Sequence, residues 1–121
     1  MKHKVQGRSL GRTANHRRAL LRNLAHELLT HRSIVTTLPK AKELQRYVEP
    51  LITKAKGELT LATRRSLLRD LSGDDVTELV EVAGQNQDRP GGYTRLTKLP
   101  VTRHDNAREV RIDFVATKEA K

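Results

Sequence analysis

The sequence contains no cysteine and no tryptophan, and only three of its 121 residues are aromatic. Without cysteine, a disulfide framework, thiol catalysis and cysteine-ligated zinc are all excluded. The interior must therefore consist mainly of Leu, Val, Ile and Ala. No apolar run reaches the roughly 18 residues of a membrane span, and the first 30 residues lack the apolar core of a signal peptide. We expect an intracellular, cytoplasmic protein, although an arginine-rich, acid-poor N-terminus is also typical of an organellar transit peptide.

Acidic residues are missing from the N-terminal stretch, where the first acid is Glu27. The whole chain carries 24 Lys and Arg against 14 Asp and Glu, a net charge of +10. An excess of this size on a small domain points to a polyanionic partner, either nucleic acid or an anionic membrane surface. Residues 1–12 also lack apolar periodicity, so they are expected to form a flexible basic arm.

The apolar pattern predicts a single α+β domain over residues 13–116, followed by a frayed tail at 117–121. About four helices are expected to pack on one side of a small mixed or antiparallel sheet. The predicted helices cover 13–31, a segment from Thr37 to Gly57, 60–71, and a short helix that starts near an Asp75/Glu78 capping box and ends at Gly84. The predicted strands cover 33–38, 93–99 and 109–115, with a long basic loop at 100–108.

The start of the first helix carries cations that its own dipole disfavours. Arg17 and Arg18 fall in the first turns, where a positive charge costs about 0.3 to 1 kcal/mol. Arg17 also lies on the arc of Leu20, so the helix start is expected to project beyond the core. An external polyanion would resolve both conflicts.

The histidines and acids do not form a recognisable catalytic or metal site. His26 and His31 are five residues apart on a predicted helix and face different directions. The acids are explained by helix capping and by pairing with nearby Lys or Arg. We therefore expect no enzyme activity, no metal, no cofactor and no small-molecule substrate, and we interpret the remaining histidines as polar or phosphate-contacting residues.

The candidate binding residues are consequently basic ones in the arm, on helix starts and in loops. Around Pro-Gly-Gly, two glycines allow a phosphate to approach the backbone, while arginines offer forked donors and a tyrosine offers a hydroxyl or a stacking face; plain turn chemistry explains the same residues. The full set is Lys2, His3, Lys4, Arg8, Arg12, His16, Arg17, Arg18, Arg22, Lys40, Lys42, Arg89, Gly91, Gly92, Tyr93, Arg95 and Arg103.

Structured RNA explains this set better than the other polyanions. No DNA-reading helix-turn-helix or zinc finger is apparent, and exposed aromatic residues for reading single-stranded bases are nearly absent. The leucine stripes are needed for the core, which disfavours a membrane surface. A DNA-binding or regulatory basic protein remains the alternative.

Three stretches carry a family resemblance: GRSLGRTANHRRALLRNLA (7–25), TTLPKAKELQRYVEPLITKAK (36–56) and RPGGYTRLTKL (89–99). In order and spacing, they resemble the bacterial-type family of large-subunit ribosomal protein seventeen. The resemblance implies an α+β globule with a basic arm, bound to large-subunit ribosomal RNA beside neighbouring ribosomal proteins, near the exit of the nascent-peptide tunnel. Gly11 stands where the family usually has Asn, and residues 84–88 differ from the usual sequence of the family.

The resemblance also assigns residues. The family's basic arm and first helix correspond to Arg8, Arg12, His16, Arg17 and Arg22. Its KAK segment corresponds to Lys40 and Lys42, and its GGYTR loop to Gly91, Gly92, Tyr93 and Arg95.

Overall fold

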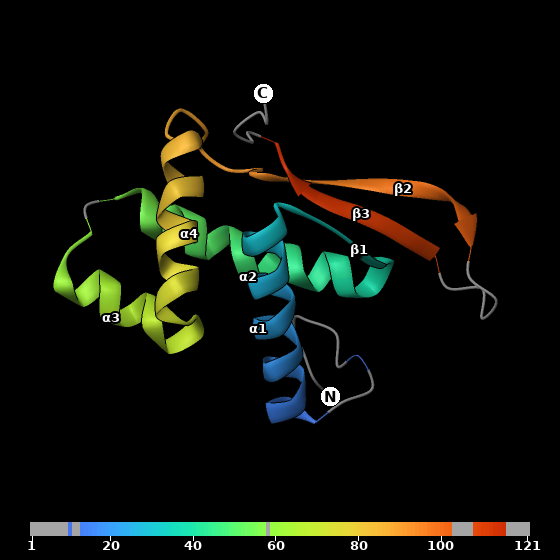
Figure 1. Cartoon of the computed structure of the whole chain (residues 1–121), viewed down its shortest axis with the longest axis horizontal. Helices are drawn as coiled ribbons and strands as arrows, with labels where there is room; N and C mark the ends of the chain where they lie inside the picture. Colours follow the sequence, from blue (N-terminus) through green and yellow to red (C-terminus); the bar gives the residue numbers. More distant parts are fainter. Residues whose placement is uncertain (1–9, 11–12, 58, 103–107, 116–121) are drawn as a thin grey trace, which may run out of the picture.

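The computed structural model describes residue 10 and residues 13–57, 59–102 and 108–115. The predicted arm (1–12), tail (117–121) and domain limit at 116 fall outside or at the edge of this part of the chain, and they stay predictions. The elements are α1 (Ala14–His31), β1 (Ser33–Thr37), α2 (Leu38–Lys56), α3 (Leu61–Asp70), α4 (Gly73–Gln85), β2 (Thr94–Thr102) and β3 (Arg108–Phe114). The predicted α+β class with four helices is confirmed (Figure 1).

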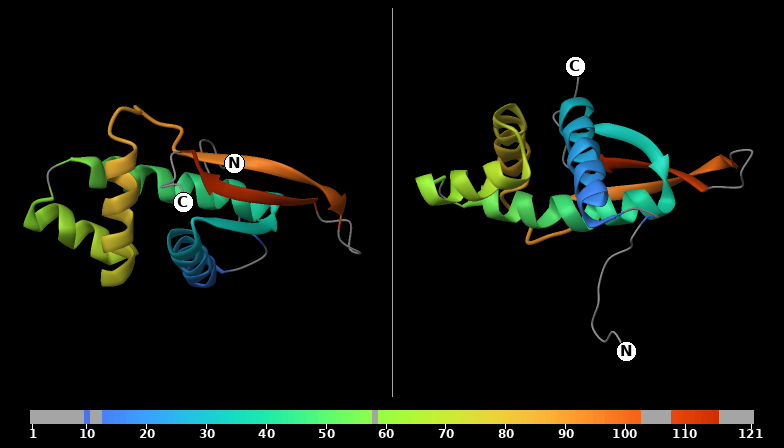
Figure 2. Two further views of the ribbon diagram at one scale, coloured as in Figure 1. Left: turned by 45° about the horizontal axis from the view of Figure 1, so that its top comes forward. Right: turned by 90° about the horizontal axis from the view of Figure 1, so that it is seen from below.

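Helix α2 is the centre of the molecule. It contacts all three strands and the other three helices, and its buried stripe includes Leu44, Val48 and Ile52. Helix α1 packs beside β1, whereas α3 and α4 lie beside the sheet and pack chiefly on other helices (Figures 1 and 2). The helix predicted between Thr37 and Gly57 runs through Pro50 as one element.

The sheet is antiparallel with the strand order β1-β3-β2. In β3, buried Val110, Ile112 and Phe114 alternate with more exposed residues, so one face packs on the helices. The other face carries Val35 opposite Arg111 in one row. This second face, on which Val35, Arg111 and Arg95 are exposed, is the wet face of the sheet.

Polar side chains fix three of the helix starts. Thr13, Thr60 and Ser72 each accept a hydrogen bond from the backbone N–H three residues later. The predicted capping box at Asp75 is therefore wrong: Ser72 is the N-cap of α4, and the Asp75 N–H donates to it at 3.3 Å. At the other end, α4 continues past Gly84 to Gln85.

Helix α3 buries only part of its leucine set. Leu67 and Leu71 are buried, but Leu61 is 65% exposed and Leu68 is 39% exposed. The physical reason is position: α3 lies at the edge of the molecule and contacts only α2 and α4 extensively. Within the described structure, only the side of α3 that packs on α2 and α4 is therefore buried.

Strand β2 is longer than the sequence predicts and passes through Pro100 to Thr102. Proline is tolerated because β2 is an edge strand with a register irregularity between Lys98 and Thr102. The predicted loop at 100–108 is correspondingly shorter.

None of the helices in the described residues is both long and apolar enough to cross a membrane.

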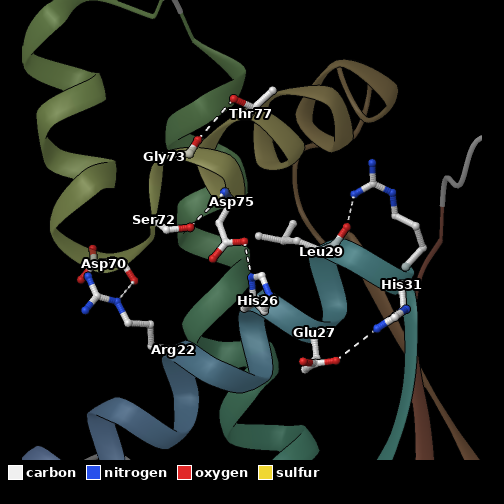
Figure 3. Close-up of polar contacts among 11 residues, drawn as sticks. Arg22, His26, Glu27, Leu29, His31, Asp70, Ser72, Gly73, Asp75 and Thr77 are labelled. Carbon is white, nitrogen blue, oxygen red and sulfur yellow. Dashed lines mark hydrogen bonds and ion pairs between the residues drawn. The ribbon is translucent and has the colours of Figure 1, made fainter.

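A buried carboxylate joins α1 to α4. Asp75 is 3% exposed, and its Oδ1 lies 2.7 Å from His26 Nδ1 (Figure 3). The hydrogen bond and the negative charge of Asp75 raise the pKa of His26 above its ordinary value of 6.5. The protonated imidazole therefore stabilises the α1–α4 contact.

We expect this pair to make stability depend on pH. Because the folded-state pKa of His26 is raised, its contribution is complete below about pH 6.5 and is lost as the pH rises through the folded value. His26 is about half exposed, so the loss is below about 1 kcal/mol. Thermal unfolding from pH 6 to pH 8.5 should show this slope in the wild type and in a His16→Gln control, but not in His26→Gln. Retention of the slope in His26→Gln would contradict the assignment.

Candidate nucleic-acid interface

The first half of α1 extends away from the core. Its buried residues, Ala25, Leu28 and Leu29, all lie in the second half, and Figure 1 shows the helix start projecting below α2. Within α1 itself, the first turn has no acidic residue. His16 and Arg18 are exposed and Arg17 is half-buried. The arrangement of cations against the helix dipole, expected from the sequence, is therefore present on a protruding helix.

Arg22 has a structural task in addition to any external one. Its Nε donates to the Asp70 carbonyl at 3.2 Å (Figure 3). Its Nη2 donates to the Arg69 carbonyl at 3.3 Å. These are the last carbonyls of α3, which have no partner within their own helix. Arg22 thus ties α1 to the end of α3.

Tyr47 of α2 completes this junction. Its hydroxyl donates to the Asp70 carbonyl at 2.9 Å. Burial, followed by the charge of Asp70, raises the pKa of Tyr47, with Arg22 and Arg18 acting in the opposite direction. The hydroxyl stays protonated near neutral pH and remains a donor.

A cavity of about 370 Å³ lies at this junction. Its walls come from one face of the first half of α1, from α2 and from the end of α3, and its lining residues are Asn15, Arg18, Ala19, Arg22, Asn23, Tyr47, Arg69 and Asp70. Three arginines therefore surround a hollow that contains a single acidic side chain.

The lysines predicted from the KAK segment lie at the other end of α2. Lys42 is exposed and Lys40 is half-buried. Residues that are two positions apart on an α-helix are rotated by about 200° around its axis, so Lys40 and Lys42 do not share a face. Since Thr37 pairs with Glu109 in the sheet, the start of α2 lies close to the start of β3, where Arg108 is exposed.

The Pro-Gly-Gly loop is held by a carboxylate of α2. Glu49 accepts hydrogen bonds from the Gly92 N–H at 3.2 Å, the Thr94 N–H at 3.0 Å and the Thr94 hydroxyl at 2.7 Å. Gly92 has a φ of 64°, a conformation that favours glycine. Its N–H is bonded to Glu49, so turn chemistry accounts for Gly92, although both Gly91 and Gly92 are exposed.

Tyr93 is a core residue, which corrects the predicted stacking face. Its side chain is 0% exposed and belongs to the main apolar cluster. Its hydroxyl lies 3.0 Å from the Thr53 hydroxyl and accepts from Lys56 at 3.2 Å. The bond with Thr53, with a further contribution from Lys56, lowers the pKa of Tyr93. Tyr93 lies just before β2, where Glu49 of α2 bonds to Thr94, and its ring packs into the core.

The two arginines that flank this loop behave differently. Arg89 is half-buried, and its backbone carbonyl accepts a hydrogen bond from the Lys56 ammonium. Arg95 is exposed on the wet face of the sheet and donates to Asp113 at 2.9 Å. This bond and the charge of Asp113 raise the pKa of Arg95. Arg95 can still offer other guanidinium donors outward.

The predicted residues therefore form separate basic regions rather than one patch. The α1 start and the loop after α4 lie at opposite sides of the molecule in Figure 1, and the start of α2 lies at a third place. Several predicted residues, Lys2, His3, Lys4, Arg8, Arg12 and Arg103, lie outside the described residues. Separate cationic regions suit a protein that touches several segments of a folded polyanion.

Sequence reasoning missed residues whose roles depend on distant partners. Arg69 joins the α1 arginines at the cavity although 47 residues separate it from Arg22. Arg32 donates to Glu78 at 2.7 Å and to the Leu29 carbonyl at 2.6 Å, which fixes the end of α1 on α4. No local spacing signals the contact of Arg22 with the end of α3 or that of Arg32 with Glu78. In the described part of the chain, no group of three or more His, Cys, Asp or Glu side chains could hold a metal ion.

These features define a small basic α+β protein whose cations lie on a protruding helix, a helix start and the wet face of a sheet. The profile of the family described as "Ribosomal protein L17" matches residues 20–115. The chain is 48% identical over 117 residues to "Large ribosomal subunit protein bL17" of Rickettsia bellii (strain OSU 85-389), covering 95% of this chain and 82% of the relative. It is 47% identical over 117 residues to the protein of the same name from Rickettsia canadensis (strain McKiel), covering 95% and 85%. The chain belongs to the ribosomal protein L17 family.

Proposed function

We propose that this protein is a structural component of the large ribosomal subunit in the cytoplasm, where it binds ribosomal RNA beside neighbouring ribosomal proteins. The observation that carries the proposal is the family match over residues 20–115, together with relatives named as large-subunit proteins. In this proposal the protein acts by binding, and no reaction is assigned to any residue. The resemblance further suggests a place near the exit of the polypeptide tunnel.

The basic regions supply the mechanism. Each Lys or Arg placed on a phosphate releases condensed counterions, which favours binding and makes it strongly dependent on salt. Because the starts of α1, α2 and β2, which carry these cations, lie apart in Figure 1, they can contact different RNA segments and hold them in register. Phosphate contacts of this kind position a protein without reading sequence.

Sedimentation tests the proposal directly. The full chain, carrying an affinity tag, should migrate with large subunits in a sucrose gradient of bacterial extract and remain there in high salt. Migration with free protein or with the nucleoid would contradict it.

Competition between RNA and DNA tests the alternative of a DNA-binding protein. At matched salt, large-subunit ribosomal RNA should displace duplex DNA of equal nucleotide concentration from the purified protein. Tighter binding to the duplex would favour the alternative.

A further inference from the structure

The cavity between α1, α2 and the end of α3 has the composition of a nucleotide site. Its volume of about 370 Å³ lies in the range of about 300–1,000 Å³ that is typical of small-ligand pockets. It is too confined for a duplex. Arg18 and Arg69 are exposed at its lining, while Ala19 and the half-buried Tyr47 provide apolar surface.

The charges of the lining favour an anionic ligand that also carries polar edges. Arg22 donates to the last carbonyls of α3, which offsets the negative end of that helix dipole, and the three arginines of the lining outnumber the one carboxylate, Asp70. Asn15 and Asn23 offer amide donors and acceptors, and Asp70 offers acceptors. A bare phosphate could use only the amide donors, whereas a nucleobase edge can also use the amide and carboxylate acceptors.

We propose that this cavity takes one unpaired nucleotide of structured RNA, with its phosphate on Arg18 and Arg69 and its base between Ala19 and Tyr47. The inference rests on the proposed function and deepens it by naming a site and its occupant. Recognition of folded RNA commonly uses bases that are splayed out of a helix and placed against aromatic or arginine planes. The α1–α3 junction provides both kinds of surface at one place.

Filling the cavity without changing charge separates this site from a merely basic surface. In Ala19→Leu, the larger side chain occupies the lining of the cavity, and leucine is compatible with a helix interior. We expect its affinity for large-subunit ribosomal RNA to fall at least about tenfold, in line with the loss of one stacked base. Ala62→Leu is the matched control, because Ala62 is exposed on α3 and does not line the cavity.

Two further measurements decide the result. Thermal melting of both variants should stay close to wild type, and Tyr47→Phe, which keeps the ring, should bind RNA better than Ala19→Leu. If Ala19→Leu binds as the wild type does while Arg18→Gln and Arg69→Gln only reduce the salt dependence, the cavity is an ordinary basic surface and the inference is wrong. A defect in subunit assembly without a defect in binding to naked RNA would identify a protein occupant and would also overturn it. If the wild type itself fails to bind ribosomal RNA, the proposed function fails instead.

Discussion

Replacing Tyr93 with alanine is expected to lower the free energy of unfolding by about 3 to 5 kcal/mol, the range for truncating a large buried aromatic side chain. Tyr93 is 0% exposed and lies in the main apolar cluster, where α2 meets the first residues of β2. Its loss leaves a cavity and removes one of the two acceptors of the Lys56 ammonium. Denaturant unfolding measures the change, and a total stability of only about 5–15 kcal/mol makes it severe.

Tyr93→Phe is the matched control for this prediction. It keeps the ring and loses the contacts to Thr53 and Lys56, so it should cost only about 1 kcal/mol. Because the side chain is buried, Tyr93→Phe should leave the affinity for ribosomal RNA unchanged. A large loss of RNA affinity in a fully folded Tyr93→Phe variant would mean that the hydroxyl contacts RNA after all.

Deleting residues 1–12 is expected to weaken binding to large-subunit ribosomal RNA by about 100- to 1,000-fold near 0.1 M salt. The deleted segment carries Lys2, Lys4, Arg8 and Arg12 and no acid. If each of the four neutralises one phosphate, the slope of log affinity against log salt should decrease by about 3 to 4. The melting temperature should change little, because the segment carries few aliphatic residues. Filter binding across a salt series, with melting curves of the same preparations, checks both parts.

A charge-only variant distinguishes the role of the cations from that of the chain. Replacing the same four residues with glutamine keeps the length and should reproduce the loss of affinity and of salt dependence. Equal losses of stability and of RNA affinity on deletion would instead assign the segment to the fold.

The local patterns predicted most of the secondary structure because their causes are local. The caps at Thr13 and Thr60 bond to an N–H three residues later, and the apolar residues of α2 recur at helical spacing. Both signals are local, so spacing alone identifies the helices. The sequence-based predictions were wrong where packing against distant segments determines strand length or burial. Pro100 continues a strand because β2 happens to be at an edge, and Leu61 is exposed because α3 lies at the periphery.

The candidate site was predicted by residue type but not by arrangement. Basic residues on the α1 start and the wet face of the sheet are placed much as the sequence suggests. Tyr93, however, is buried in the core, and the Gly92 N–H donates to the Glu49 carboxylate of the same chain. The Gly-Gly-Tyr pattern is equally consistent with a binding loop and with a turn. Only the Glu49 carboxylate, 43 residues before Gly92, decides between them for that N–H.

The sequence by itself determined the family, the α+β class and the strongly cationic character of the chain, because these depend on composition, short spacing and recognisable motifs. The tertiary structure decided which cations are free to face outward and which hold the protein together. Arg22 illustrates the difference: in sequence it is one more basic residue of α1, and in the fold its guanidinium closes the end of α3. The cavity beside it exists only because side chains from three separate helices, α1, α2 and α3, meet there, and no local pattern can encode such a meeting.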